Sequence, residues 1–551
     1  MSHPHAIIIL GTGALSTARR IQALYPGAQV YGLNERVTAD VGYSEFASQL
    51  RELYQNNRPI IALCAAGIVI RCLAPLLQSK GAEPPVLAVA EDGSAVVPLL
   101  GGLAGVNVMA REIATALEVQ AAITTSGELR FDTCVLNPPS GYVVGDIEQG
   151  KRFVSSLLGG ENVRIEGDAP WLHAARLPLA DDANLRIRIS TDIQANADEL
   201  LIHPRSVVVL NPPADAALIQ HSLAAAGISP HALACLLSPR SQMADAQLHS
   251  TAATLGVPLR FSEETALNVA HRVQQSEGIQ LAIASQPIDI HSLGQARGRL
   301  TVVGLGPGAS EFTAPAVKLA LHDAQDVLGY ETYVTMAGPF RPDQVLHNSD
   351  NREELARSRH AFELAASGRR VVVVSSGDPG VFAMAAAVLE ALEASSDADW
   401  HNVELQILPG ISASLATAAK AGAPLGHDFC MISLSDNLKP WDVIELRLKH
   451  ATLADLALAF YNPISRARPW QLGRALDVVR EQRQPETVVV LGRDIGRPAE
   501  ALTVTTLGEL TPEMVDMRTM VIIGSSTTRR FAKAGSEAGW VYTPRSYPAR
   551  S

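Results

Sequence analysis

Four loops built of glycine and other small residues are the best candidates for holding a ligand in the C-terminal half. They follow apolar, strand-like runs and comprise Gly304–Gly308 (GLGPG), Ser375–Gly380 (SSGDPG), Leu408–Ser414 (LPGISAS) and Phe460–Pro463 (FYNP). Glycine lets the backbone approach a ligand closely, and Pro307 holds the turn of the first loop. Gly377 leaves space beside the carboxylate of Asp378. No Gly-Lys-Ser/Thr follows the first loop, which excludes a Walker phosphate loop.

Polar residues also follow strand-like runs in the N-terminal half. Arg71, Glu91, Asp92 and Asn107 each come after an apolar run or a glycine-rich stretch. Because the carboxyl ends of parallel strands meet at one edge of a sheet, these four side chains are expected to converge in one crevice. The alternative interpretation is that the glycines form turns and the carboxylates cap helices.

A glycine turn near the N-terminus nearly matches a dinucleotide-binding fingerprint. Gly11 and Gly13 follow a strand-like run, and Glu35 lies at about the distance expected of a ribose-binding acid. Ser16 stands where the third glycine belongs, and any turn from a strand into a helix favours small residues. We therefore favour a plain turn, and an NAD(P)-dependent oxidoreductase domain stays open as an alternative.

Strand-like runs alternate with helix-length segments along most of the chain, which predicts an α/β protein. The runs are Ala6–Leu10, Gln29–Leu33, Ile60–Cys64, Val86–Ala90, Ala121–Thr124, Leu185–Ile189, Ser206–Leu210, Leu233–Leu237, Val257–Phe261, Leu300–Val303, Arg370–Val374, Val403–Leu408, Leu456–Tyr461, Thr487–Leu491 and Met520–Ile523. The predicted units are an α/β domain at 1–135, a connector at 136–205, a small α/β domain at 206–267, a linker at 268–298 and an α/β domain at 299–551. Gln286–Gly298 is the best linker candidate, because it is polar and lacks helical or strand periodicity.

Length and composition restrict the class of protein. A chain of 551 residues is long enough for three or four domains, and 47% hydrophobic with 18% charged residues is ordinary for packed domains. Lys and Arg number 45 against 56 Asp and Glu, so the net charge is −11 and generic nucleic-acid binding is disfavoured. The five cysteines form no CxxC pair, which argues against a disulfide framework and a structural zinc site. No apolar run reaches about 18 residues. We expect a cytoplasmic protein without a membrane span.

The four loops of the C-terminal half together resemble the class III S-adenosylmethionine-dependent tetrapyrrole methyltransferases, over about residues 299–540. Gly329–Tyr333 (GYETY), Ile432–Trp441 (ISLSDNLKPW) and Tyr461–Pro463 (YNP) are similar to the precorrin-3B C(17)-methyltransferase subfamily, CobJ and CbiH. The resemblance implies two subdomains with a tetrapyrrole cleft between them, S-adenosyl-L-methionine as cofactor and a homodimer. It also implies methylation of carbon 17 with contraction of the ring, and no metal.

The same resemblance implies roles for individual residues. Those expected to border the cofactor are Gly304, Leu305, Gly306, Pro307, Gly308, Gly377, Asp378, Val381, Ser412, Ala413 and Phe460. Ser433, Asp436 and Lys439 are candidates for acid-base help in the ring contraction, although Asp436 also suits a turn and Ser433 a cap. The arginines available for substrate carboxylates are Arg352, Arg357, Arg359, Arg466, Arg468, Arg493 and Arg497. For the first three, a solvated helical face is an equal alternative.

In the N-terminal half, three strings resemble the N-terminal domain of CbiG, the cobalt-precorrin-5A hydrolase of cobalamin biosynthesis, over about residues 60–126. They are Cys64–Arg71 (CAAGIVIR), Pro84–Gly93 (PPVLAVAEDG) and Leu100–Asn107 (LGGLAGVN). Opening a lactone needs a base or an activated water and a stabilised oxyanion, for which Arg71, Glu91 and Asp92 are the candidates. Gly102 stands where that family usually has a histidine.

The C-terminal CbiG-like unit also departs from its family. It has Asn211-Pro212-Pro213 where the motif GxGCRRG is common. Two hypotheses follow for a fusion enzyme of corrin-ring synthesis that acts on a tetrapyrrole, with no nucleic-acid or membrane partner. In one, the N-terminal half is a hydrolase beside a methyltransferase. In the other, residues 1–267 only bind or channel a labile intermediate.

Overall fold

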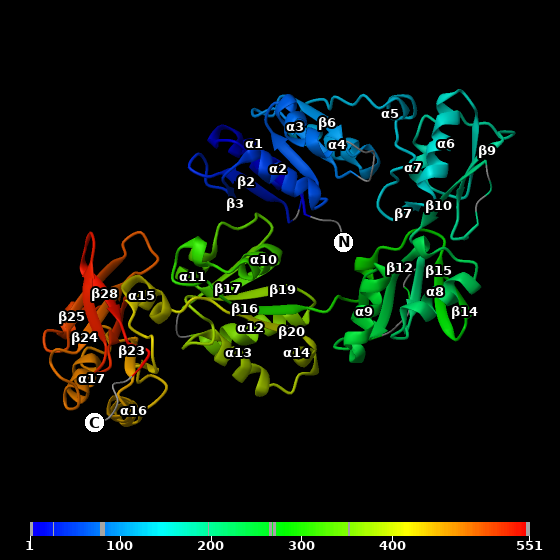
Figure 1. Cartoon of the computed structure of the whole chain (residues 1–551). Helices are drawn as coiled ribbons and strands as arrows, with labels where there is room; N and C mark the ends of the chain where they lie inside the picture. The colour runs from blue at the N-terminus through cyan, green and yellow to red at the C-terminus, as the bar shows by residue number, and fades with distance from the viewer. Residues whose placement is uncertain are drawn as a thin grey trace.

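The computed structural model folds into successive α/β units, each with its own sheet (Figure 1). It describes residues 4–25, 27–77, 83–194, 196, 198–263, 267, 271–350 and 353–546. In Figure 1 the first unit, in blue, lies above the part of the C-terminal half drawn in yellow-green, and the cyan and green units that follow it lie at the right-hand end of the molecule. The α/β fold class is confirmed. Among the described residues, no helix is both long and apolar enough to cross a bilayer.

The first unit is a six-stranded sheet in the order β3-β2-β1-β4-β5-β6, parallel except for β6. Its elements are β1 (Ala6–Ile9), α1 (Leu15–Gln22), β2 (Gln29–Leu33), β3 (Val41–Tyr43), α2 (Phe46–Gln55), β4 (Ile60–Leu63), α3 (Ala66–Leu73), β5 (Val86–Val89), β6 (Val96–Leu100) and α4 (Val106–Leu117). Ile7 and Ile9 of β1 face α1 and α4, whereas Ile8 faces α2 and α3. Burial on both faces explains the continuous apolar runs. The predicted strand at Ala121–Thr124 is wrong, since only an isolated bridge joins Ala121 to Val96.

The segment predicted as a connector, 136–205, is a folded unit with its own core. Its elements are α5 (Ser126–Phe131), β7 (Tyr142–Val144), α6 (Ile147–Leu158), β8 (Val163–Glu166), α7 (Pro170–His173), β9 (Leu185–Ile189) and β10 (Glu199–Pro204). Phe131, Phe153, Leu157 and Ile187 are buried in that core. The sequence signal was weak because β8 and β9 are only partly buried, so their polar residues interrupt the apolar runs.

The third unit extends into the predicted linker, so the boundary at 268 is wrong. Its elements are β11 (Val207–Leu210), α8 (Ala216–Ala225), β12 (Leu233–Pro239), α9 (Ala246–Leu255), β13 (Leu259–Ser262), β14 (His271–Ser276) and β15 (Ile279–Ala284). Strand β15 pairs with β11, and β14 forms the edge. The edge strand is mostly exposed and therefore polar in sequence, so its sequence resembles that of a linker. Residues 285–298 do connect this unit to the next.

The C-terminal half contains two subdomains. The first has a parallel sheet in the order β18-β17-β19-β16-β20. Its elements are β16 (Arg299–Gly304), α10 (Pro315–Asp323), β17 (Asp326–Tyr330), α11 (Glu331–Ala337), β18 (Val345–Ser349), α12 (Glu354–Ala366), β19 (Arg370–Ser375), α13 (Met384–Glu393), α14 (Ala398–Asn402) and β20 (Glu404–Leu408). Val371 and Val373 of β19 pack against α12 and α13, whereas Val372 and Val374 pack in the core on the other face of the sheet.

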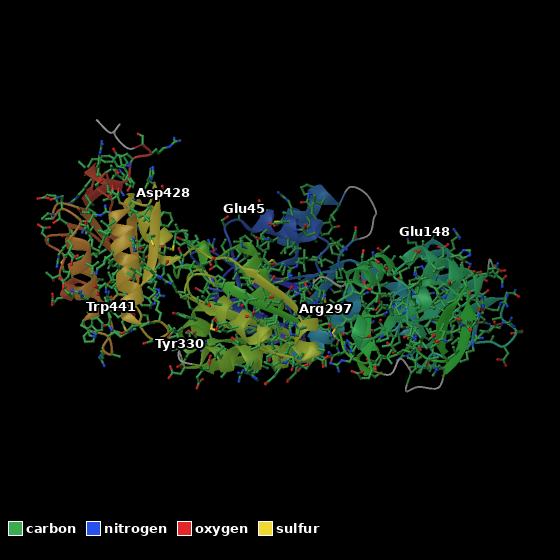
Figure 2. The ribbon with its side chains drawn as sticks, turned by 90° about the horizontal axis from the view of Figure 1, so that it is seen from below. Glu45, Glu148, Arg297, Tyr330, Asp428 and Trp441 are labelled. Carbon is green, nitrogen blue, oxygen red and sulfur yellow. The ribbon has the colours of Figure 1, made fainter. Side chains whose placement is uncertain are left out.

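The second subdomain has a mixed sheet in the order β22-β23-β26-β24-β25 and a small sheet β21-β28-β27. Its elements are α15 (Ala413–Ala421), β21 (Gly422–Ala423), β22 (Phe429–Ser433), α16 (Trp441–Leu453), β23 (Ala457–Tyr461), α17 (Gln471–Arg480), β24 (Val488–Arg493), β25 (Ala501–Thr506), β26 (Thr519–Ile523), β27 (Arg529–Lys533) and β28 (Ser536–Tyr542). Figure 2 labels Tyr330 on the first subdomain and Trp441 on the second.

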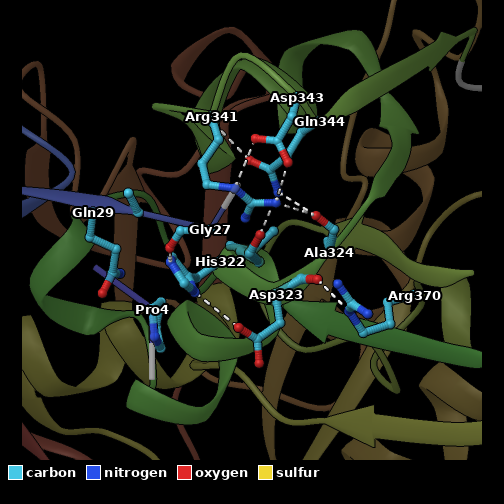
Figure 3. Close-up of polar contacts among 12 residues, drawn as sticks. Pro4, Gly27, Gln29, His322, Asp323, Ala324, Arg341, Asp343, Gln344 and Arg370 are labelled. Carbon is cyan, nitrogen blue, oxygen red and sulfur yellow. Dashed lines mark hydrogen bonds and ion pairs between the residues drawn. The ribbon is translucent and has the colours of Figure 1, made fainter. Parts of the chain in front are cut away.

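Specific polar contacts join the N-terminal units to the C-terminal half. The ring Nε2 of His322, on α10, lies 2.7 Å from the carbonyl oxygen of Gly27 in the first unit, as Figure 3 shows. The guanidinium of Arg240 in the third unit donates to Asp399 of α14 at 2.8 Å. The first subdomain therefore contacts both the first and the third units directly.

Candidate functional site

Three of the predicted loops meet at one edge of the first subdomain. Strand β16 lies between β19 and β20 in the parallel sheet, so the loops after these strands emerge side by side. Gly306 N–H donates to the Gly377 carbonyl at 3.1 Å, and Gly377 N–H donates to the Gly306 carbonyl at 2.9 Å. The first two loops are therefore joined backbone to backbone.

Glycine is required at this edge because no side chain fits between the loops. A Cβ on Gly304 would lie 2.4 Å from the Gly377 oxygen, and one on Gly410 would lie 2.2 Å from the same oxygen. Gly377 itself has a φ of +68°, a conformation that other residues rarely adopt. The three loops thus form a backbone cradle, defined here as residues 304–308, 376–381 and 409–413.

Asp378 links two loops of this cradle. One of its carboxylate oxygens accepts from Gly380 N–H at 2.8 Å and the other from Gly410 N–H at 3.0 Å. A carboxylate offers about four lone-pair sites, so acceptor capacity remains after these two bonds. The Asp378 side chain is half-buried, so part of its carboxylate is accessible to a ligand at the cradle.

The second subdomain borders the cradle through Ser412, Ser414 and Tyr461. Ser412 Oγ caps α15 by accepting from Leu415 N–H, and it lies 3.0 Å from Ser414 Oγ. Ser414 Oγ in turn lies 2.9 Å from the Tyr461 hydroxyl. The Tyr461 ring packs 5.2 Å, centroid to centroid, from the ring of Phe382, which follows β19. These contacts connect the loops of both subdomains.

Two of the predicted cofactor residues point away from the cradle. Leu305 is 4% exposed and Phe460 is 0% exposed, and each side chain lies in the core of its own subdomain. Only their backbone atoms can face a ligand. Pro307 and Gly308 instead meet the second subdomain, since Arg497 Nε donates to the Pro307 carbonyl at 3.2 Å. Val381 and Ala413 are half-exposed.

The three candidate acid-base residues lie at the end of β22 and just after it, near the same boundary. Ser433 Oγ accepts from Asn462 Nδ2 at 3.1 Å, and the Asp436 carboxylate accepts from Gln471 Nε2 at 3.1 and 3.2 Å. Lys439 Nζ lies 5.8 Å from the centroid of the Phe382 ring. Burial, and secondarily the nearby Arg447, lower the pKa of the Lys439 ammonium. Lys439 is thus a weaker base than an ordinary lysine, and a readier proton donor.

The predicted arginines are mostly engaged in the structure. Arg357 is 5% exposed and donates to Ser349 and to the Asp350 carbonyl, so the solvated-face alternative is wrong for it. Arg359 and Arg466 are exposed, Arg468 donates to the Asn462 carbonyl, Arg493 pairs with Asp516, and Arg352 lies outside the described residues. Sequence reasoning missed Arg447, which lines a cavity with Ser433 and Lys439.

The N-terminal candidates do not converge. Arg71 is exposed on α3, and both carboxylates are exposed beyond β5. Asp92 accepts from Ser94 N–H at 3.0 Å, which is a turn contact. Among the residues described, no hydrogen bond or ion pair joins Arg71, Glu91 and Asp92. Glu91 Oε1 would lie 2.2 Å from a Cβ on Gly13, so a carboxylate occupies the space beside the glycine turn and disfavours a dinucleotide phosphate there.

Asn107 belongs instead to a buried network. Its Nδ2 donates to Glu128 at 2.6 Å and to Thr125 at 2.9 Å, and Glu128 pairs with Arg111 at 2.6 Å. Sequence reasoning missed Arg111 and Glu128 because they lie on α4 and α5, outside the strand ends. Within the described ranges, no group of three or more His, Cys, Asp or Glu side chains is arranged to hold a metal ion.

Comparison with known proteins identifies two segments. Residues 299–511 match the family model of tetrapyrrole (corrin/porphyrin) methylases, and residues 48–128 match the model of the cobalamin synthesis G N-terminal domain. The precorrin-3B C(17)-methyltransferase of Sinorhizobium sp is 51% identical over 254 residues, which cover 46% of this chain and 99% of that protein.

Two further similarities concern the same half of the chain. The cobalamin biosynthesis protein CobIJ of Mycobacterium tuberculosis is 46% identical over 255 residues, covering 46% of this chain but only 49% of that relative. A crystal structure of the methyltransferase CobJ is 53% identical, covers 45% of this chain and 100% of that chain, and has a TM-score of 0.43.

A Gly410→Ala substitution tests the backbone cradle. The added Cβ must displace the Gly377 carbonyl, so we expect the loops around β16, β19 and β20 to lose about 1–3 kcal/mol of local stability. Hydrogen exchange of the full chain measures this loss. Gly473→Ala in α17 is the matched control, because its Cβ would meet only Pro512 at 3.8 Å, and it should stabilise that helix slightly. Equal effects of the two changes would contradict the packing described.

Proposed function

This chain belongs to the tetrapyrrole (corrin/porphyrin) methylase family, and on that premise we propose that its C-terminal half methylates precorrin-3B at carbon 17 and contracts the ring. The observation that carries the proposal is the 51% identity that extends over 99% of a precorrin-3B C(17)-methyltransferase. The N-terminal half carries a cobalamin synthesis G domain, so both halves belong to cobalamin biosynthesis.

Tetrapyrrole methylases use S-adenosylmethionine, and the backbone cradle fits this methyl donor. Free backbone atoms of residues 304–308 and 409–413 would hold its adenosine, and the carboxylate of Asp378 has acceptor capacity left for its polar groups. The negative charge of Asp378 also complements a cationic ligand. When bound, the donor supplies an electrophilic methyl group on a sulfonium.

The residues of this chain would act mainly by alignment and by excluding water. Tyr461 and Phe382 place an aromatic boundary between the cradle and the cavity lined by Ser433 and Lys439. Lys439, with its lowered pKa, would donate a proton during the ring contraction. Ser433 accepts a hydrogen bond from Asn462, and Asp436 accepts one from Gln471. These hydrogen bonds would hold both side chains in place to orient substrate groups near Lys439.

For the N-terminal half, we propose binding of a labile pathway intermediate rather than lactone hydrolysis. Glu91 and Asp92 are exposed, Asp92 is engaged in a turn, and Gly102 offers no acid-base group where the related hydrolases usually have histidine. A hydrolytic site needs its base and its oxyanion donors within hydrogen-bond reach of one another. The direct contacts of the first and third units with the methylase half suit a binding role.

The proposed reaction is tested by incubating the full chain, and residues 299–551 alone, with precorrin-3B and S-adenosylmethionine. Mass spectrometry should detect a product that is one methyl group heavier with both proteins, because the donor cradle and the cavity lie within that half. Parallel incubation with the cobalt-bearing counterpart is the control for substrate class. Methylation of only the cobalt compound would make the precorrin-3B assignment wrong.

Asp378→Asn tests the donor site. The change removes the negative charge and leaves one of two backbone N–H groups without its acceptor, so affinity for S-adenosylmethionine should fall about 10- to 100-fold. Isothermal titration calorimetry measures this affinity. Glu390→Gln, an exposed carboxylate on α13, should leave it unchanged. Unaltered affinity for S-adenosylmethionine in Asp378→Asn would mean that Asp378 only links the two loops and does not contact the donor.

The role of the N-terminal half is tested with cobalt-precorrin-5A. We expect the full chain to bind this compound, seen as a change in its absorbance spectrum, without releasing acetaldehyde above the buffer rate in a coupled dehydrogenase assay. Release of acetaldehyde that is lost in Glu91→Gln would instead establish a hydrolase and contradict the binding proposal.

A further inference from the structure

A cavity of about 430 Å³ is lined in part by Phe382, the residue that directly follows the second loop of the cradle. Most of its lining comes from β22 and α16 of the second subdomain, and Phe382 of the first subdomain contributes one wall. The Phe382 ring packs against Tyr461, and Lys439 Nζ lies 5.8 Å from the centroid of the same ring. The cavity is therefore adjacent to the cradle but distinct from it.

The walls of the cavity are apolar, with three basic side chains among them. Met431, Ile432, Leu446 and Leu456 supply apolar surface, and the basic residues are Lys439, Arg447 and His450. A pocket of this kind favours a ligand with a broad apolar body and anionic substituents. The chain as a whole has a net charge of −11, so this local excess of positive charge runs against the average.

Lys439 and Arg447 have no carboxylate partner, by ion pair or by hydrogen bond, among the residues that the structure describes. By contrast, two other basic side chains near α16, Lys449 and Arg474, both pair with Glu445, at 3.1 and 3.0 Å. Arg447 also lies close enough to Lys439 to lower the pKa of its ammonium. Neighbouring cations repel each other, so an anionic ligand would relieve this repulsion.

We propose that Lys439 and Arg447, with the ring N–H of His450, bind peripheral carboxylates along one edge of the tetrapyrrole substrate. This inference rests on the proposed function, because it assigns the carboxylate-binding residues of that same reaction. Guanidinium groups bind carboxylates through paired, charge-assisted hydrogen bonds, which fix orientation as well as affinity. The macrocycle edge would enter the apolar cavity past Phe382, toward the donor held in the cradle.

Arg447→Met is the decisive variant, since Arg447 is exposed, forms no ion pair within the described ranges and lies outside the proposed acid-base residues. We expect the KM for precorrin-3B to rise about tenfold, with kcat within about twofold and the KM for S-adenosylmethionine unchanged. Arg447→Lys should recover part of the affinity. Lys449→Met is the matched control on the same helix, because its charge is paired with Glu445. A loss of kcat without a change in KM would overturn the inference.

Binding without the methyl donor separates this inference from the proposed function. Absorbance titration of precorrin-3B into the full chain gives a dissociation constant even if no methyl transfer follows. Weaker binding in Arg447→Met, with a smaller dependence on salt than in the unaltered chain, would support the carboxylate contact even where turnover fails. Equal binding by the unaltered chain, Arg447→Met and Lys449→Met would overturn it, as would the absence of any binding by the unaltered chain.

Discussion

The close approach of three loop backbones at the carboxyl edge of one parallel sheet is the constraint on which the C-terminal half depends. Gly304 and Gly410 both face the Gly377 carbonyl at distances that exclude a side chain. Asp378 then fixes the third loop to the second through the Gly410 N–H. Because the strands β19, β16 and β20 are neighbours, this packing needs no long connection, and the sheet itself sets the spacing of the loops.

The second subdomain is attached to this edge by side chains rather than by sheet pairing. Arg497 reaches the Pro307 carbonyl, and the Tyr461 ring packs against Phe382. Phe382 contributes a ring from the first subdomain to the same boundary. The boundary thus has a backbone surface on one side and side chains of varied chemistry on the other. The backbone surface suits a methyl donor that many enzymes share, and the side chains suit a substrate that differs between enzymes.

Much of the fold could be predicted from apolar runs, since buried parallel strands such as β1, β4 and β19 have side chains in cores on both faces. Strand β14 could not, because it is an exposed edge whose polar sequence resembles a linker. The glycine loops were visible since their spacing after strands is local. Arg447 was not, because its significance depends on β22, Phe382 and Lys439, which meet it only in three dimensions.

The separation of the cradle from the cavity has a consequence for how such an enzyme can diverge. The cradle depends on three glycines and on Asp378 of the first subdomain, so few of these residues can be replaced without disturbing it. The cavity is lined chiefly by side chains of β22 and α16, and the close glycine contacts of the cradle involve none of them. Preference for a different macrocycle can therefore evolve on one helix and one edge strand while the cradle stays constant.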